Sequence, residues 1–338
     1  MLEAHDRTNI PNPDDRLVYD AIASKHAFPC LAISVELGLY EELNQQPLPI
    51  SIISERLRIS PRATEAIVAV VAAMGFLRAD EDDCFTLTDV SRTYLLPTSP
   101  FYRDDLTHSQ LPATNQLRAA LSSQEEPPQP FAVNLQELPT DWQQSFMQTM
   151  HAMTLPAATA VAQHPIFKQS RNLLDVAGGT GSLSMAIAKY HAQIQCEILE
   201  LEPICQIARE HIEAAELSAR IKATPFNMFH DQWPTGADTI LFGNIFHDWD
   251  LDSCRLLARR SFDSLKPGGA ICLHEMLLHS RKDGPLTVAL FSIAMLLHEK
   301  GKQFTANELV DLLTMTGFTD VQVTPSFGYY SLITAIKP

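Results

Sequence analysis

Residues 172–181 read NLLDVAGGTG, and residues 182–190 continue as SLSMAIAKY. The first segment is a short apolar run that ends in three glycines within four residues, and the second has the apolar spacing of a helix. Glycines at a strand–helix turn let backbone N–H groups approach a ligand closely. The stretch predicts the first strand and helix of a fold that binds a nucleotide-like molecule.

The same alternation continues toward the C-terminus. Further strands are predicted at 196–201, 220–226, 238–244 and 270–276, with helices at 204–216 and 251–265 between them. Strand–helix repetition of this kind predicts an α/β domain with a parallel, Rossmann-like sheet and helices on both faces. A helix at 306–316 is then followed by two strands joined by the turn FGYY, which predicts a terminal antiparallel hairpin.

The N-terminal part is mostly helical by pattern. Residues 14–43 are predicted to be helical with a break at Pro29, and Ser51 is predicted to cap a short helix through Leu57. Ser60 and Pro61 provide a cap and first residue for a second helix, and the acidic hairpin RADEDDCFTLTD follows at 78–89. Helix, tight turn, helix and hairpin in this order are the outline of a winged helix.

A winged helix raises the possibility of DNA recognition, which needs cations for phosphates and polar side chains for base edges. The second helix carries only Arg62 as a cation, and the hairpin carries four consecutive acidic residues at 80–83. We therefore expect this domain to serve packing or dimerisation, and no nucleic-acid partner.

Composition supports these expectations. The 338 residues suggest two domains, and 25 Lys and Arg against 40 Asp and Glu give a net charge of −15, which disfavours nucleic-acid or anionic membrane partners. The longest uncharged apolar stretches, 66–77 and 287–297, are too short to span a bilayer, and no secretory signal is visible. Six scattered cysteines without a C-x-x-C pattern favour reduced thiols, a cytoplasmic protein and no metal site.

The change of pattern places the domain boundaries. We predict a winged-helix-like domain at 1–115, a linker with connecting helices at 116–164, and an α/β domain at 165–338. The linker contains the Pro- and Gln-rich segment SSQEEPPQPFAV at 122–133, and a helix is predicted from Asp141. Trp142, Phe146, Met150 and Met153 lie on one face of that helix, a stripe that is more typical of a core than of a ligand wall.

The strand ends supply candidate ligand-binding groups. A carboxylate at the tip of the second strand suits a grip on two ribose hydroxyls, and Glu200 is the first choice, with Glu202 as the alternative. The two acids could also be merely solvated. Counted from Gly179, the dinucleotide pattern G-x-G-x-x-G reads GTGSLS, so Ser184 stands where the third glycine belongs and an NAD site is disfavoured.

The fourth and fifth strands supply a candidate base. His247 follows the fourth strand in GNIFHDW, and Glu275 ends the fifth strand in CLHEM. Ligands of open parallel sheets bind beyond the carboxyl ends of the strands, so both side chains are expected at the same edge. A carboxylate that faces a histidine fixes its tautomer and raises its basicity, as a general base requires. A purely structural histidine is the alternative.

These segments together resemble a known family. DVAGGTG, the acidic end of the second strand, PFNMF (225–229), NIFHDW (244–249), LKPGGAICLHE (265–275) and GKQFT (301–305) occur in this order. They resemble the S-adenosylmethionine-dependent O-methyltransferases of the plant and microbial small-molecule type, such as caffeate and hydroxyindole enzymes of secondary metabolism. The resemblance implies a seven-stranded class I methyltransferase sheet, S-adenosylmethionine as cofactor, and a homodimer formed through the N-terminal domain.

The resemblance also implies roles for individual residues. Cofactor-binding residues would be Asp175, Gly178, Gly179, Gly181, Glu200, Asn227, Met228 and Trp249, with Asn227 and Met228 beside adenine. His247 would be the catalytic base, Glu275 the carboxylate that orients it, and Gln303 a second group that flanks the histidine.

Four positions depart from the family pattern. Ala177 replaces the first glycine of a G-G-G run, and Asn227 replaces an acidic adenine contact. Gly243 stands where Lys or Arg is common. Gln303 replaces a second glutamate, so it can accept a hydrogen bond but cannot stabilise imidazolium by charge.

The expected reaction is methyl transfer from S-adenosylmethionine to a phenol or enol oxygen of an aromatic or polyketide-like molecule. His247 would remove the hydroxyl proton, and alignment of oxygen and methyl group would supply much of the rate. Candidate walls of the acceptor pocket are Phe146, Met150, Phe291 and Met295. The alternatives are an enzyme of the same fold that uses the cofactor for rearrangement or elimination, and a regulatory protein with a decayed site.

Overall fold

The computed structural model describes residues 10–122 and 138–338. The Pro- and Gln-rich segment at 122–133 of the predicted linker therefore lies, apart from its first residue, outside the described residues. The chain divides into two compact units. The first, here called the sheet unit, comprises Met1–Arg16, Phe131–Met276 and Asn307–Pro338. The second, here called the helical unit, comprises Leu17–Pro130 and Leu277–Ala306. The domain boundaries predicted from the sequence stay a prediction.

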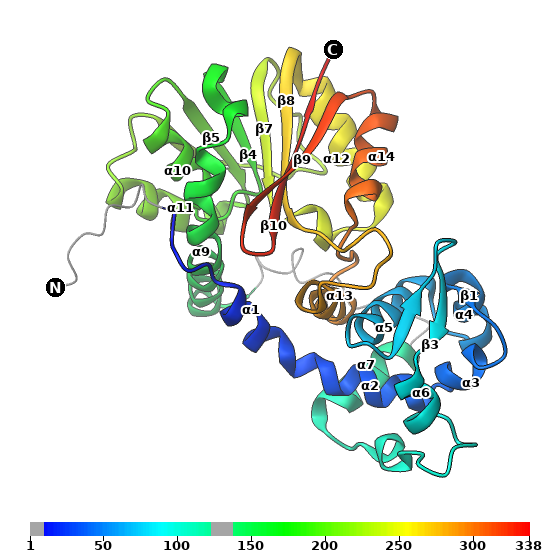
Figure 1. Ribbon diagram of the computed structural model, residues 1–338. Coiled ribbons are helices and arrows are strands. Elements are labelled where there is room, and N and C mark those ends of the chain that lie inside the picture. Colours follow the sequence, from blue (N-terminus) through cyan, green and yellow to red (C-terminus); the bar gives the residue numbers. More distant parts are fainter. Residues whose placement is uncertain (1–9, 123–137) are drawn as a thin grey trace. The chain divides into compact units, whose positions relative to one another are not determined.

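The sheet unit contains a seven-stranded sheet in the order β6-β5-β4-β7-β8-β10-β9 (Figure 1). Its strands are β4 Asn172–Val176, β5 Gln195–Glu200, β6 Ile221–Pro225, β7 Ala237–Gly243, β8 Leu265–Met276, β9 Thr319–Phe327 and β10 Tyr330–Ile336. Pairing is parallel from β6 through β8, whereas β10 runs antiparallel to both β8 and β9. The predicted sheet with a terminal antiparallel hairpin is confirmed.

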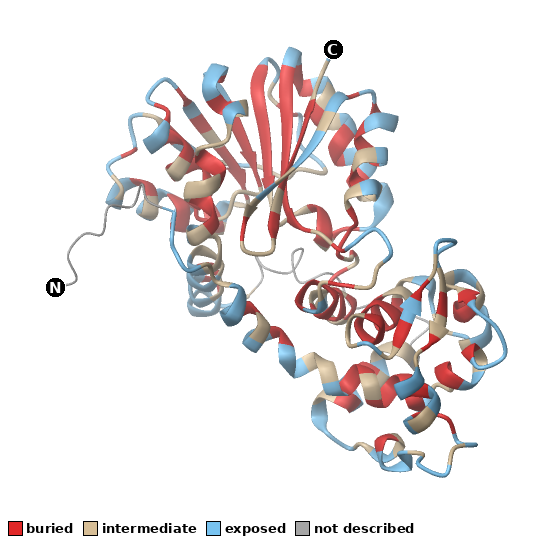
Figure 2. Ribbon diagram, in the orientation of Figure 1, coloured by how far each residue is buried: buried red, intermediate tan, exposed pale blue. Residues whose placement is uncertain are grey.

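Helices connect the strands as expected from the alternation. They are α9 Thr140–Ala162, α10 Ser182–Tyr190, α11 Glu202–Ala214, α12 Leu251–Ser264 and α14 Ala306–Thr316, with short 3₁₀ turns η4 Pro165–Gln169 and η5 Phe246–Asp248. The inner strands are buried along most of their length, as the red ribbons of Figure 2 show. Strands covered on both faces are apolar at successive positions, which is why LLDV and TILF read as continuous runs.

The register brings the functional segments to one edge of this sheet. Val176 of β4 pairs with Leu199 of β5, so the glycine turn and Glu200 follow neighbouring strand ends. Gly243 of β7 pairs with His274 of β8, which places the segment after β7 next to Glu275. Parallel strands end at a common edge, and this edge carries the glycine turn, Glu200, His247 and Glu275.

The helical unit carries the N-terminal elements and one later helix. They are α1 Arg16–Ala23, η1 Ser24–His26, α2 Ala27–Glu36, α3 Leu39–Leu43, β1 Leu48–Pro49, α4 Ile50–Leu57, α5 Pro61–Ala73, β2 Leu77–Ala79, β3 Cys84–Leu87, α6 Asp89–Tyr94, η2 Asp104–His108, α7 Pro112–Ser122 and α13 Leu286–His298. The strands form a small antiparallel sheet in the order β1-β3-β2. The helix, turn, helix and hairpin predicted for residues 51–89 are all present.

Local signals in this unit predicted two features correctly and one incorrectly. Ser60 caps α5, since its Oγ accepts a hydrogen bond from Ala63 N at 3.2 Å, and Pro61 follows as the first helical residue. The predicted break near Pro29 is present, because the 3₁₀ turn η1 (Ser24–His26) separates α1 from α2. Pro29 itself lies in the first turn of α2, where its missing N–H has no helical partner to lose. Ser51 is not a cap, because α4 already begins at Ile50 after Pro49.

Helix α9 is longer than predicted and rotated with respect to the predicted stripe. It begins at Thr140 and continues through Pro156 to Ala162. Its buried residues in the first two turns are Gln143 and Met147, whereas Trp142 is 45% exposed. The expectation that the aromatic and Met stripe forms core is therefore wrong for Trp142. Among the described residues, no helix combines the length and apolarity needed to cross a membrane.

Candidate functional site

The glycine turn between β4 and α10 brings backbone close to its surroundings. Gly179 and Gly181 have φ values of 56° and 80°, in the left-handed region that favours glycine. A Cβ on Gly178 would lie 2.5 Å from Cγ of Asp175, and a Cβ on Gly181 would lie 2.5 Å from Cδ1 of Ile198. The turn therefore excludes side chains at these positions and presents N–H groups at the start of α10. Ala177 also has a positive φ, 53°, which a glycine would adopt with less strain.

Asp175 lies buried beneath this turn. Its Oδ2 accepts a hydrogen bond of 2.7 Å from the Ser184 hydroxyl, and its Oδ1 has no partner among the described residues. Burial raises the pKa of Asp175 to about 6, while the Ser184 contacts lower it less. An unpaired buried carboxylate oxygen is a strong acceptor for a ligand donor.

Glu200 lies at the end of β5 and contacts the same turn. Its Oε2 accepts a hydrogen bond from Gly179 N at 3.0 Å, and its Oε1 accepts one from Leu201 N at 2.7 Å. Burial raises the pKa of Glu200 to about 7, the two backbone N–H groups lower it, and the charge of Asp175 adds to the increase. The alternative, Glu202, is half exposed and forms an ion pair with Arg209, so the geometry favours Glu200 as a ligand-binding group.

A histidine that the sequence analysis did not identify also reaches this turn. Nδ1 of His151, on α9, lies 2.8 Å from Thr180 Oγ1 and 2.9 Å from Ser182 Oγ, and its ring stacks on His211 at 4.4 Å. Thr180 and Ser182 are buried. This cluster adds three polar groups at the start of α10. No signal in the sequence pointed to it, because α9 and the glycine turn are far apart along the chain.

The two residues expected beside adenine, Asn227 and Met228, follow β6, and Trp249, which was expected near the cofactor, follows β7. Asn227 Oδ1 accepts a hydrogen bond from Phe229 N at 3.0 Å, so this acceptor is already used within its own turn. The backbone oxygen of Met228 accepts a hydrogen bond from Trp233 Nε1 at 3.0 Å. Trp249 is 9% exposed and its ring meets Phe229 edge to face at 4.5 Å. Phe229 was quoted within PFNMF but was not singled out.

The strongest local constellation surrounds His247. Its Nδ1 lies 2.5 Å from Glu275 Oε2, and Glu275 Oε1 accepts hydrogen bonds from Ile245 N and Phe246 N at 3.1 and 2.8 Å. Three donors thus fix the carboxylate, and the carboxylate fixes the ring. On its other side, Nε2 of His247 lies 3.2 Å from Asp248 Oδ1. Asp248 directly follows His247 in HDW, and nothing in the sequence pattern singled it out.

Two carboxylates change the protonation of this histidine. Burial by itself lowers the pKa of His247, but the charges of Glu275 and then Asp248 outweigh it, and the pKa is raised well above 6.5. With both ring nitrogens facing carboxylates, the free protein holds an imidazolium near neutral pH. A proton must leave before this side chain can act as a base.

Gly243 packs closely against Leu183 of α10. A Cβ at this position would lie 2.4 Å from Cδ1 of Leu183 on α10. The space that a larger side chain would need is therefore filled by an apolar group from the adjacent helix. A Lys or Arg side chain at position 243 would therefore collide with Leu183.

The remaining predicted residues are divided between the units. Phe146 and Met150 are half-buried on α9 of the sheet unit, and the Phe146 ring stacks on Trp142 at 5.5 Å. Phe291 and Met295 are half-buried on α13 of the helical unit, where Phe291 meets the Tyr19 ring at 5.9 Å. Gln303 also belongs to the helical unit; it is fully buried, and neither atom of its amide has a partner among the described residues.

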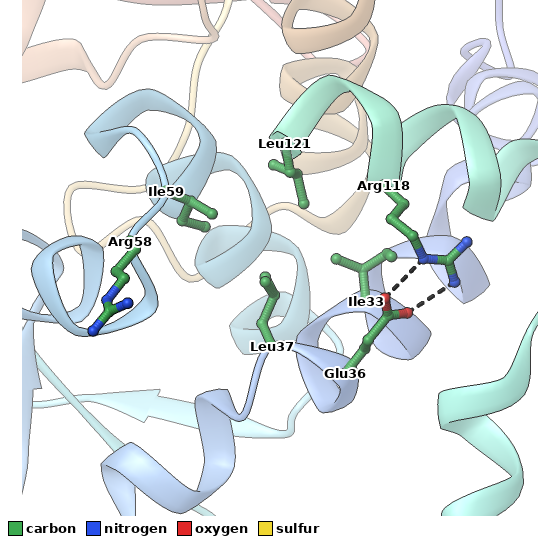
Figure 3. Close-up of a pocket in the computed structure, with 7 residues that line it drawn as sticks. All are labelled: Ile33, Glu36, Leu37, Arg58, Ile59, Arg118 and Leu121. Carbon is green, nitrogen blue, oxygen red and sulfur yellow. Dashed lines mark hydrogen bonds and ion pairs between the residues drawn. The ribbon is translucent and has the colours of Figure 1, made fainter. Parts of the chain in front are cut away.

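A cavity of about 230 Å³ lies elsewhere in the helical unit, lined by Ile33, Glu36, Leu37, Arg58, Ile59, Arg118 and Leu121 (Figure 3). Arg118 binds Glu36 through two hydrogen bonds of 2.7 and 2.8 Å, so these opposite charges satisfy each other. No nucleophile or histidine lines it, and it is no candidate for the reaction site. Within residues 10–122 and 138–338, no group of three or more His, Cys, Asp or Glu side chains is arranged to hold a metal ion.

Comparison with known proteins assigns both parts of the chain. The O-methyltransferase domain family matches residues 131–319, and the O-methyltransferase dimerisation domain family matches residues 20–97. A 3-hydroxy-5-methyl-1-naphthoate 3-O-methyltransferase of Streptomyces sahachiroi is 27% identical over 86% of each chain. The acetylserotonin O-methyltransferase of Bos taurus is 28% identical over 91% of this chain and 93% of its own.

Among solved structures, an O-methyltransferase family 2 protein from Planctomyces limnophilus in complex with apigenin has a TM-score of 0.89 and 28% sequence identity. The alignment covers 98% of this chain and 99% of the other. The similarity therefore extends over the whole fold and includes both units.

Proposed function

We propose that the chain methylates a phenol or enol oxygen of an aromatic or polyketide-like small molecule. The proposal proceeds from the finding that the chain belongs to the O-methyltransferase family and uses S-adenosylmethionine. The relatives named above support this class of acceptor, since one methylates the 3-hydroxyl of a naphthoate and the other acts on acetylserotonin. His247 is the general base of the proposed reaction.

The residues at the sheet edge fit S-adenosylmethionine. The glycine turn leaves room for the methionine part and offers backbone donors. The unpaired Oδ1 of Asp175 can accept a hydrogen bond from an ammonium group, and Glu200 has lone pairs left for two ribose hydroxyls. When bound, S-adenosylmethionine supplies an electrophilic methyl group on a sulfonium.

His247 then has one nitrogen for the acceptor. Glu275 holds Nδ1, so Nε2 is the atom that serves the acceptor. Nε2 first releases its own proton to solvent, and the neutral ring then takes the hydroxyl proton as the acceptor oxygen is methylated. Asp248, which faces Nε2 at 3.2 Å, must give up this contact to the acceptor hydroxyl. Glu275 keeps the ring in one orientation and stabilises the imidazolium that results.

One observation carries the proposal: a buried histidine fixed by a carboxylate, which is itself fixed by two backbone N–H groups, at the sheet edge that also carries Glu200 and the glycine turn. A structural histidine needs no such support at a ligand-binding edge. Positioned groups of this kind contribute large effective molarities, on the order of 10⁵ M or more.

We also propose supporting roles for residues outside this edge. Phe146, Met150, Phe291 and Met295 contact the acceptor, and Gln303 replaces the second glutamate that flanks the histidine in the family. Two copies of the chain pair through the matched dimerisation region, whose exposed apolar side chains include Ile22, Phe28 and Val90. A cytoplasmic location stays a prediction; all six cysteines are free, and five are buried.

The test is transfer of label from methyl-labelled S-adenosylmethionine to a panel of naphthols, hydroxyindoles and hydroxyflavones. We expect labelled methyl ether from the wild-type protein and a loss of about 10²- to 10⁴-fold in kcat for His247→Ala. The matched control is His108→Ala, which removes an exposed histidine of the helical unit. Equal transfer by His247→Ala would remove His247 as the base, and a rearranged, unlabelled product would favour the non-methylating alternative.

A further inference from the structure

The chain after β6 forms a tight turn at residues 226–231 of the sheet unit, here called the β6 turn. It starts beside Glu200, because Phe226 N donates to Glu200 O at 2.8 Å. The carbonyl of Asn227 then accepts a hydrogen bond from Asp231 N at 2.9 Å, and Asn227 N donates to Asp231 Oδ2 at 2.7 Å. The turn is therefore closed on itself and lies at the same sheet edge as Glu200.

Arg260 of α12 binds the β6 turn through three of its carbonyl groups. Nη1 donates to Met228 O at 3.2 Å and to Asp231 O at 2.9 Å, and Nη2 donates to Phe229 O at 2.7 Å. A guanidinium offers several N–H donors in one fixed plane, so it can bind neighbouring carbonyls that would otherwise repel one another. Hydrogen bonds from a charged donor are also stronger than neutral ones. Arg260 therefore fixes the shape of the turn.

Trp233 supplies a second donor to the same turn. Its Nε1 donates to Met228 O at 3.0 Å, and its side chain is buried. Its ring meets the Phe226 ring edge to face at 5.9 Å, so it also packs against the first residue of the turn. The backbone of Met228 is thus held by Arg260 and Trp233 together.

The N–H of Met228 can still serve a ligand. The contacts of the turn with itself, Arg260 and Trp233 use the carbonyl groups of residues 227, 228, 229 and 231. They also use the N–H groups of residues 227, 229, 230 and 231. The N–H of Met228 is not among them. A donor that is held in place next to Glu200 suits an acceptor nitrogen of a base.

The place of the β6 turn in the sheet fits the base of S-adenosylmethionine. In the proposed function, the methionine part lies on the glycine turn after β4, and the ribose lies on Glu200 at the end of β5. Strands β4, β5 and β6 are neighbours in this order. The base follows the ribose on the side away from the methionine part, so it lies over the end of β6. Adenine has an acceptor at N1, whereas hypoxanthine has an N–H there.

We propose that Arg260 is a positioning residue for the cofactor, which holds the β6 turn in the shape that binds adenine and thereby sets a preference for adenine over hypoxanthine. The inference rests on one part of the proposed function, the placement of the ribose on Glu200. Arg260 acts through the backbone of Met228, whose N–H pairs with N1 of adenine. Hypoxanthine would bring a second donor to this N–H, and two donors that face each other are both left unpaired, which costs binding free energy.

The test compares S-adenosylhomocysteine with S-inosylhomocysteine, which differ only in the base. Titration calorimetry on the full chain measures both Kd values, and we expect the wild-type protein to bind the adenine compound at least about tenfold more tightly. Arg260→Met should raise the Kd of the adenine compound roughly tenfold and reduce the preference to less than about threefold, because the turn loses its shape. In methyl-transfer assays it should raise KM for S-adenosylmethionine with a smaller effect on kcat.

Three further variants separate positioning from general damage. Arg260→Lys should recover part of the preference, since an ammonium can still donate to carbonyls. Trp233→Phe removes the donor to Met228 O but keeps an aromatic ring, and it should also lower the preference. The matched control is Arg259→Met, which removes the neighbouring, exposed arginine of α12. Its guanidinium lies over the Phe262 ring at 5.4 Å, and its loss should change neither Kd.

A full adenine preference in Arg260→Met would overturn the inference even if both compounds bind more weakly, because equal losses show a structural role. A wild-type protein without the preference would overturn it as well. The preference is a ratio of two constants measured on one preparation, so partial unfolding of a variant does not change it. Adenine-selective binding that Arg260→Met abolishes, together with no methyl transfer to any acceptor, would support the inference and overturn the proposed methylation.

Discussion

The affinity for S-adenosylmethionine should depend on the ionisation of Glu200. Burial raises the pKa of this carboxyl to about 7, and ribose hydroxyls bind best to the ionised form. An apparent Kd equals the intrinsic Kd divided by the competent fraction, which is about nine-tenths near pH 8 and about one-tenth near pH 6. We therefore expect the Kd to be about tenfold higher near pH 6 than near pH 8.

The affinity should fall at low pH because the pKa of Glu200 is raised. The cofactor selects the carboxylate, so binding below the raised pKa of Glu200 must release a proton. Titration calorimetry in two buffers of different ionisation enthalpy measures that release. It should approach about one proton near pH 6 and fall to about 0.1 near pH 8.

Two variants identify the titrating group. Glu200→Gln should bind weakly and lose most of the pH dependence, keeping only the smaller change near pH 6 that comes from Asp175, whose pKa is raised to about 6. Asp175→Asn should keep the pH dependence but move its midpoint lower, because the Asp175 charge helps to raise the pKa of Glu200. A wild-type Kd that varies less than about twofold over this range, or an unchanged slope in Glu200→Gln, would refute the reasoning.

Three further predictions concern neighbouring residues. Asp248→Asn removes one of the charges that raise the pKa of His247, so the acid limb of the kcat/KM profile should move to lower pH. An unmoved limb in rate measurements would exclude Asp248 from control of the base. Gly243→Ala forces a Cβ against Leu183 and should lower the free energy of unfolding by about 1–3 kcal/mol in denaturant titrations. Leu183→Ala is itself expected to be destabilising, because Leu183 is buried, but the double variant should lose less than the sum of the two single losses. Strictly additive effects would contradict the packing argument. His151→Phe removes the ring nitrogen shared by two hydroxyls and should raise the cofactor Kd about 5- to 10-fold in calorimetry, with kcat at saturation nearly unchanged.

Most of the sheet unit could be predicted from local pattern. Apolar runs bounded by turns marked β4 to β8, and the helix–strand–strand ending marked the terminal hairpin, because strands covered on both faces must be apolar at successive positions. The break near Pro29 could also be expected, because a proline ring disfavours helix about four residues before it, and the 3₁₀ turn η1 lies there. The prediction failed in the first two turns of α9, where Gln143 and Met147 are buried and Trp142 of the predicted stripe is exposed.

Some contacts of the site could be predicted from the sequence, and others could not. The meeting of His247 with Glu275 could be expected, because both follow strands that end at the same edge. The contact of Asp248 with the second ring nitrogen, the reach of His151 to the glycine turn, and the filling of the Gly243 space by Leu183 could not. Each depends on side-chain direction or on packing between segments distant in sequence, and periodicity carries neither.

The sequence by itself determined the fold class and the main candidates for its chemistry, because strand periodicity and glycine turns are local features. The family and the cofactor followed from the resemblance that the ordered motifs carry. The tertiary structure decided how these groups act. It placed two carboxylates on one imidazole, buried Glu200 until its pKa rose to about 7, and used Arg62 of α5 to hold the end of α13. Burial and charge proximity arise only when distant segments pack, and they set which protons these side chains hold.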